Sequence, residues 1–216
     1  MKLSGKHTGL ACSDGVFIDR RQLQSGDHAN WAAAHRILMN RAIEAAVFEN
    51  GSDTILSEGL AYDRCQVGVV TNVDVARHTG RYYIETPEHV FNVLRTQIDL
   101  VLAKGAAVLN AKEPMLVEMA PLCDGEVIYF ALDPQLPAIA EHLGRGKRAV
   151  IVRYGQIMLA SDQGEVALAR LSDVPLTESG KNTMQVENIL AAVAAAWALD
   201  VSLDVMRTGI ETFFIE

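Results

Sequence analysis

Short apolar runs alternate with helical patterns along the first two thirds of the chain, and this alternation constrains the fold more than any other feature. The runs cover residues 45–49, 67–72, 107–111 and 126–132. Each is apolar on both faces, which is typical of parallel strands covered by helices on both sides. The sequence therefore predicts an α/β fold with a mostly parallel sheet and helices on both faces.

Helical patterns fill the spaces between these runs. One helix is predicted from residue 27 or 28 to 41, with Asp27 as its N-cap. A second is predicted over residues 86–103, where Thr86 can cap it and Pro87 suits its first turn. A third begins at about residue 114. Strands alternating with helices in this way place ligands beyond the carboxyl ends of the strands.

The pattern changes after residue 145. Three short strands joined by Tyr-Gly and Gln-Gly turns predict a small antiparallel meander, and two helices follow over residues 186–199 and 203–212. We expect a single domain of 216 residues. Its three parts are expected to be an α/β core (about 1–145), the meander (about 146–175) and C-terminal helices (about 176–216).

Charge and composition exclude several classes of protein. The chain has 19 Lys and Arg against 27 Asp and Glu, a net charge of −8, which argues against nucleic-acid partners. Its longest apolar run, residues 189–199, is about half the roughly 20 residues that a bilayer requires, so no membrane partner is expected. The polar N-terminus does not resemble a signal peptide. Three widely spaced cysteines have no metal-ligand spacing, and we expect a cytoplasmic protein.

Several segments are recognisable. The stretch AAVFENGSDTILSEGLAYDRCQVGVVTNV resembles the central Mur-ligase-like domain of cyanophycin synthetase, as do GAAVLNAKEP, CDGEVIYFALDP and QVENILAAVAAAWAL. The resemblance runs from about Gly5 to Phe213, so the expected single domain is similar to a Mur-ligase central domain. It implies an ATP-dependent amide ligase, in which ATP phosphorylates a carboxylate and an amine attacks the acyl phosphate. ATP and Mg²⁺ are the implied cofactors if the ancestral site survives.

Two parts of the family pattern fall outside this sequence. The family's glycine-rich phosphate loop precedes the segment with which this chain begins. The nearest similar run, Ser4 to Thr8, lacks the loop's spacing and is predicted to lie before a strand. We therefore expect no phosphate cradle here. In the family, a further α/β lobe follows the segment that Gly209 to Phe213 matches.

The resemblance also points to a vestigial Mg²⁺ site. Glu49 matches the family's metal-binding glutamate at a strand end, and His78 matches a histidine that helps to hold a second metal. A solvated strand-end acid and an ordinary hydrogen-bonded histidine are the alternatives. Arg77 stands where the family has an aspartate, and Leu94 where it has a lysine. The arginine that follows the glutamate in the family is also lost.

A vestigial ATP site is implied in the same way. Asn110 matches the residue that approaches the adenine, whose edge an amide suits because it offers both a donor and an acceptor. Gln185 and Asn188 match a helix start that faces the nucleotide. Strand-end and helix-cap hydrogen bonding are the alternatives for all three. Lys112 and Glu113 replace two aspartates of the family, which changes the charge at this point.

These changes favour a degenerate, non-catalytic Mur-ligase-like domain that acts as a structural or protein-interaction module. The alternative is a fragment or subunit of an ATP-dependent, amide-bond-forming ligase of cyanophycin synthesis. The hydrophobic ending Phe213-Phe214-Ile215 and the acidic surface favour a protein partner. We expect a homo-oligomer or a cyanophycin-synthetase-like partner chain.

Overall fold

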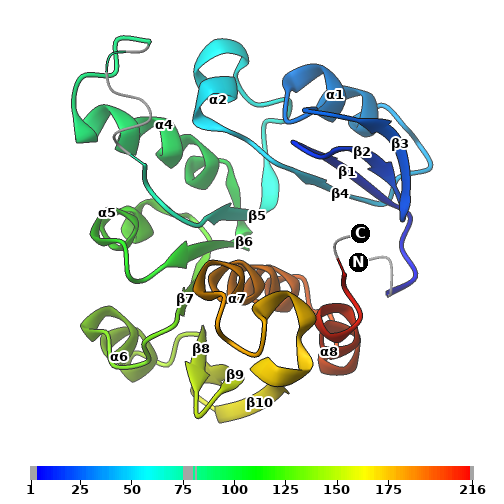
Figure 1. The fold of residues 1–216 in the computed structure, drawn as a ribbon. Coiled ribbons are helices and arrows are strands. Elements are labelled where there is room, and N and C mark those ends of the chain that lie inside the picture. Colours follow the sequence, from blue (N-terminus) through cyan, green and yellow to red (C-terminus); the bar gives the residue numbers. More distant parts are fainter. Residues whose placement is uncertain (1–3, 75–79, 81, 215–216) are drawn as a thin grey trace. The chain divides into compact units, whose positions relative to one another are not determined.

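The computed structural model describes residues 4–74, 80 and 82–214 of the chain. They cluster into two compact units (Figure 1). Unit 1 consists of Met1–Asp63 and Asp74–Leu94, and unit 2 of Arg64–Val73 and Arg95–Glu216. The single domain expected from the sequence stays a prediction, and each unit is described in turn.

Unit 1 is built on a four-stranded sheet. Its strands are β1 (Thr8–Cys12), β2 (Gly15–Ile18), β3 (Arg21–Ser25) and β4 (Ala45–Phe48), in the order β3-β2-β1-β4. Strands β1, β2 and β3 pair in antiparallel fashion, whereas β4 pairs with β1 in parallel. The helices α1 (Trp31–Leu38) and α2 (Ser52–Glu58) belong to the same unit.

The two faces of this sheet carry different rows of side chains. Ala11 pairs with Val16 on one side and Phe48 on the other, and this row packs with Ile37 of α1 in a small core. Because side chains alternate along a strand, the neighbouring row points away from α1. That second row is Val47, Leu10 and Phe17.

Helix α1 starts later than the sequence suggested. Its N-cap is Asn30, whose side chain accepts a hydrogen bond from the Ala33 amide. The Asp27 carboxylate instead accepts from the Ala29 amide, a local turn that ends before the helix begins. The prediction of Asp27 as N-cap is therefore wrong, because a second capping residue stands three positions later. Asn30 has the extended backbone of an N-cap, and its side chain accepts from the first turn of the helix.

Unit 2 is built on a six-stranded sheet in the order β10-β9-β8-β7-β6-β5. Strands β5 to β8 run parallel, and β8 to β10 form the antiparallel meander, which continues the same sheet. The strands are β5 (Cys65–Val70), β6 (Val101–Asn110), β7 (Glu126–Ala131), β8 (Ala149–Arg153), β9 (Gln156–Ser161) and β10 (Gly164–Arg170). The predicted fold class, a mostly parallel sheet with helices on both faces, is confirmed.

Helices cover both faces of this sheet (Figure 1). Helix α7 packs on one face, and α5 and α6 lie on the other. On β7, Ile128 and Phe130 join the core beneath α7, so Val127 and Tyr129 point to the opposite face. The remaining elements are α4 (Pro87–Asp99), α5 (Pro114–Met119), η2 (Ala120–Leu122), α6 (Pro137–Gly144), η3 (Leu171–Asp173), η4 (Pro175–Thr177), α7 (Thr183–Ala198) and α8 (Leu203–Glu211).

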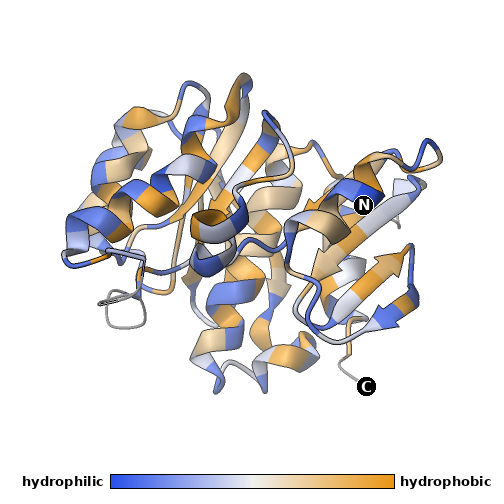
Figure 2. Ribbon diagram, turned by 90° about the horizontal axis from the view of Figure 1, so that it is seen from above, coloured by the Kyte–Doolittle hydropathy of each residue, from blue (hydrophilic) through white to orange (hydrophobic). Residues whose placement is uncertain are grey.

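Helix α4 ends four residues before its predicted end. It stops at Asp99, and Val101 already pairs with Cys65 as the first residue of β6. Pairing with a neighbouring strand thus overrides the helical pattern of residues 101–103. Figure 2 shows the strands rich in hydrophobic residues, whereas the helices alternate between hydrophobic and hydrophilic ones. Among the described residues, no helix has the length and apolar character needed to cross a bilayer.

Candidate functional site

The carboxyl ends of β5 and β6 lie side by side in unit 2. Val70 ends β5 and pairs with Leu109, one residue before the end of β6. In open parallel sheets, ligands bind beyond this edge. Asn110, the last residue of β6, is therefore where an inherited nucleotide site would lie.

The Asn110 side chain is engaged by the main chain at both ends. Its Nδ2 donates to the Thr71 carbonyl at 3.1 Å, and its Oδ1 accepts from the Lys112 amide at 3.1 Å. The residue is 2% exposed. Its amide thus joins the loop after β5 to the turn after β6, the strand-end alternative that the sequence left open. Thr71 had no signal in the sequence, because its contribution is a main-chain carbonyl.

The start of α7 comes to the same edge. The Lys112 ammonium lies 3.6 Å from the Glu187 carboxylate of α7. Asn182 caps the helix by accepting from the Gln185 amide at 3.2 Å, and Asn188 donates its side-chain amide to the Gln185 side chain at 3.3 Å. The structure thus places Gln185 and Asn188 in the first two turns of α7, linked to the β6 end through the Lys112–Glu187 pair.

Glu49 lies in unit 1, directly after β4. One oxygen of its carboxylate accepts from both the amide and the hydroxyl of Ser13, each at 2.8 Å. Ser13 belongs to the Ser-Asp-Gly turn between β1 and β2, so Glu49 fixes this turn to the end of β4. The side chain is exposed, but one of its two oxygens is already used within the protein.

The structure gives little support for a metal site at the other residues matched to it. His78 and Arg77 lie outside the described residues. Leu94, which stands where the family has a lysine, is 7% exposed on α4. In the described part of the chain, no group of three or more His, Cys, Asp and Glu side chains is arranged to hold a metal ion.

The run from Ser4 to Thr8 leads into β1, which begins at Thr8. Its amides face carboxylates: His7 donates to Glu44 at 2.8 Å, and Thr8 donates to Asp19 at 3.1 Å. A phosphate-binding loop needs such amides free to face an anion. Here the amides of His7 and Thr8 already bind the protein's own anions.

Known proteins resemble this chain along nearly its whole length, although no family model matches it. Cyanophycin synthetase of Crocosphaera subtropica is 35% identical over 97% of this chain and 24% of its own length. That of Synechocystis sp. is 32% identical over 97% of the chain and 24% of its length. The chain thus spans about a quarter of the curated relatives it matches.

More distant likenesses extend to peptidoglycan ligases. UDP-N-acetylmuramoyl-L-alanyl-D-glutamate–2,6-diaminopimelate ligase of Geobacter metallireducens is 28% identical over 82% of this chain and 32% of its own length. A solved structure of a ligase with that name covers the whole chain and 42% of its own, with a TM-score of 0.67 and 15% identity. The UDP-N-acetylmuramate:L-alanyl-gamma-D-glutamyl-meso-diaminopimelate ligase of Neisseria meningitides has a TM-score of 0.56 at 13% identity, over all of this chain and 60% of its own. The solved structures therefore show a shared fold.

Proposed function

We propose a function from the premise that this chain is a relative of cyanophycin synthetase and of the Mur ligases. It is a non-catalytic Mur-ligase-like module with a structural or protein-interaction role. The resemblance implies where a nucleotide and its metal would bind, and the contacts of those residues support a different use for them.

The state of Asn110 carries the proposal. An adenine needs an amide that it can reach, whereas this side chain is 2% exposed and hydrogen-bonded at both ends to the main chain. Freeing the amide would leave the Thr71 carbonyl and the Lys112 amide without their partner. A buried polar group that loses its partner costs about 1–3 kcal/mol. The contacts of Asn110 therefore support a role in holding the β5 and β6 ends together.

The matched metal ligand supports the same conclusion. Mg²⁺ requires several hard oxygen ligands in a nearly octahedral arrangement. Glu49 has one oxygen committed to Ser13, and Leu94 offers no ligand atom. As they stand, Asn110, Glu49 and Leu94 thus do not fit the binding of Mg²⁺-ATP.

A titration of Mg²⁺-ATP into the purified chain tests this proposal. We expect no heat in calorimetry and no shift in unfolding temperature at millimolar nucleotide. Mg²⁺-tripolyphosphate is the matched control, because it carries the triphosphate chain of ATP without the adenosine. A ligand at about 100 times its Kd stabilises a fold by about 2.7 kcal/mol, so binding would be visible. Stabilisation by ATP alone would contradict the proposal.

The second candidate is a segment of an ATP-dependent, amide-forming ligase. One observation favours it: the Lys112–Glu187 pair brings the start of α7, with Gln185 and Asn188, to the carboxyl edge of the sheet. Asn188 is exposed, so its replacement by alanine leaves the fold intact. ATP binding that Asn188→Ala weakens would support this candidate, with the rest of the site supplied by another part of the protein or by a partner.

An interaction role needs a surface, and unit 1 offers one. Val47 is 50% exposed in the row that points away from α1, and Leu10 and Phe17 beside it are half-buried. In unit 2, Phe213 and Phe214 are 52% and 66% exposed. Adjacent apolar side chains in contact with water are typical of protein contact sites. They support the proposal that the module binds a second copy of itself or a synthetase-like chain.

A further inference from the structure

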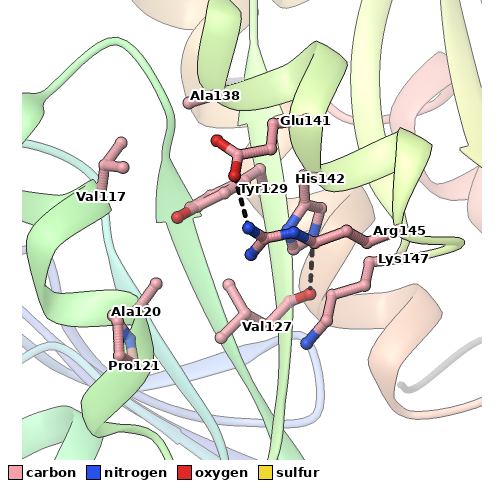
Figure 3. Close-up of a pocket in the computed structure, with 10 residues that line it drawn as sticks. All are labelled: Val117, Ala120, Pro121, Val127, Tyr129, Ala138, Glu141, His142, Arg145 and Lys147. Atoms are coloured by element: carbon pink, nitrogen blue, oxygen red, sulfur yellow. Dashed lines mark hydrogen bonds and ion pairs between the residues drawn. The ribbon is translucent and has the colours of Figure 1, made fainter.

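A cavity of about 300 Å³ lies in unit 2, on the sheet face opposite α7 (Figure 3). Its floor is the outward-facing side of β7, formed by Val127 and Tyr129. Its walls come from the α5–η2 segment, including Val117 and Pro121, and from α6 with the turn that follows it. The volume is at the small end of the range for sites that bind organic ligands.

The local sequence explains why this space is open. Helix α5 has only six residues, and the chain turns into η2 at Ala120 and Pro121. A proline so near a helix end favours termination of the helix. The short helix leaves part of β7 without a covering side chain, and Tyr129 extends into the space that remains (Figure 3).

Two neutral polar groups line the cavity. The Nε2 of His142 lies 3.0 Å from the Val127 carbonyl and 3.1 Å from the Arg148 carbonyl, so Nε2 carries a proton and donates. Burial lowers the pKa of His142, which keeps the ring neutral. Burial also raises the pKa of Tyr129, so its hydroxyl stays protonated. Within the described residues, that hydroxyl has no hydrogen-bond partner in the protein, and it is not among the unpartnered atoms that are buried from solvent.

The charged groups at the mouth sum to one positive charge. Arg145 and Glu141 form an ion pair at 2.5 Å and so neutralise each other. Lys147 also lines the cavity, and its ammonium has no acidic partner among the residues that the structure describes. An apolar floor, an unpartnered hydroxyl and one unpaired cation therefore face the same space.

We propose that this cavity binds a small organic acid with one negative charge and a compact aromatic body. The ring packs between Pro121 and Tyr129, and the carboxylate lies at the mouth beside Lys147. The Tyr129 hydroxyl is placed to donate to a polar substituent or to the carboxylate. A neutral molecule of the same shape would leave the lysine without a counter-charge, so the site discriminates by charge as well as by shape. This proposal is independent of the one for Asn110 and Glu49.

The test compares phenylacetate with phenylacetamide, which have the same ring and differ in charge. Each probe is titrated to millimolar concentration into the whole ¹⁵N-labelled chain, and amide shifts are recorded. We expect phenylacetate to shift the amides of α6, β7 and the turn around Lys147. Phenylacetamide should bind about threefold more weakly or worse, as expected for the loss of one exposed ion pair.

Variants decide which residues carry the binding. Lys147→Gln should weaken the binding of phenylacetate about threefold or more. Tyr129→Phe should also weaken this binding, because it removes the hydroxyl and keeps the aromatic ring of residue 129. Lys104→Gln is the matched control, because Lys104 is another exposed lysine and does not line the cavity. If Tyr129→Phe fails to fold, the exposed Lys147 still provides the test.

Three outcomes would overturn the proposal. The first is the absence of shifts around the cavity at millimolar phenylacetate. The second is equal binding of the acid and the amide. The third is an equal loss of binding in Lys147→Gln and Lys104→Gln, which would indicate a general effect of net charge.

Discussion

The Asn110 side chain satisfies two main-chain groups at the point where β6 leaves the sheet. Because the residue is buried, water has little access to replace it. Asn188 has the same side chain but is exposed on α7, where its partner is another side chain. Comparing Asn110 with Asn188 therefore contrasts a buried structural asparagine with an exposed one. The family resemblance places both positions near the same nucleotide.

We expect Asn110→Ala to lower the free energy of unfolding by about 2 kcal/mol, since two hydrogen bonds are lost at a buried site. Asn188→Ala should change it by less than about 0.5 kcal/mol, as is usual for a surface substitution. Urea unfolding of both variants, monitored by circular dichroism, measures the difference. Equal stabilities would mean that Asn110 is not needed for the fold, which would revive the nucleotide interpretation.

His142 makes stability depend on pH. Its pKa is lowered below the ordinary value of 6.5, chiefly by burial. Below that value the unfolded chain binds a proton that the folded chain resists. The contribution is therefore fully present above pH 6.5 and is lost as the pH falls from there toward the lowered folded-state pKa. We expect His142→Gln to reduce the drop in unfolding temperature between pH of about 7.5 and 5.

His142→Gln should give a flatter pH profile of the unfolding temperature than the wild type. A wild-type profile for this variant would show that His142 titrates alike in the folded and unfolded chains.

At the residue scale, the sequence predicted positions better than contacts. Glu49 and Asn110 do stand at strand ends, as their apolar runs indicated. What they bind was open, because Ser13 and Thr71 contribute through groups that no pattern distinguishes. The cavity at Tyr129 was not predicted either. Val127 and Tyr129 alternate with core residues in a strand that is apolar throughout, so its two faces look alike in the sequence.

Among the elements of unit 1, helix α1 approaches strand β1 closely at Gly9. A Cβ added to Gly9 would lie 2.4 Å from the Cγ2 of Ile37, much closer than two carbons approach. Glycine is thus required here by the approach of a helix to a strand. Gly51, at the start of α2, has an ordinary φ of −73° and no atom within 4 Å of such a Cβ.

Gly9→Ala should therefore destabilise the chain by about 1–3 kcal/mol, the usual cost of overpacking a core. Gly51→Ala is the matched control and should change the stability by only a few tenths of a kcal/mol. Thermal unfolding with an amide-exchange readout for β1 and α1 would locate the effect in unit 1. A neutral Gly9→Ala would show that α1 can shift away from the strand at little cost.

Element boundaries show where local pattern and tertiary pairing disagree. The helical period of α4 continues in the sequence to residue 103. Val101 nevertheless belongs to β6, because it pairs with Cys65 of β5. Capping chemistry likewise favours both Asp27 and Asn30, and only the backbone decides between them. The strands were predicted more reliably, since a short apolar run between polar turns rarely forms anything other than a buried strand.

At the scale of the whole molecule, the order of elements could be predicted because each parallel strand needs a crossover. Three of the four apolar runs, 67–72, 107–111 and 126–132, indeed form strands of the sheet in unit 2. The fourth run, 45–49, forms β4 of the other sheet, which its apolar pattern did not distinguish. The continuity of the meander with the sheet of unit 2 could not be predicted, because it depends on the pairing of β7 with β8. The division into two units has no signal either, since residues 64–73 belong to unit 2 although their sequence neighbours on both sides belong to unit 1.

The proposed self-association depends on the row of Val47, Leu10 and Phe17. Val47 is half exposed, and a lysine there would place a charge within the buried contact. We expect sedimentation velocity to show a concentration-dependent dimer for the wild type and a smaller dimer fraction for Val47→Lys. Val166→Lys is the matched control, since Val166 is 49% exposed on β10 of unit 2. A wild type that stays monomeric, or an equal loss of the dimer in both variants, would contradict self-association through this row. The partner of the module would then have to be a different chain.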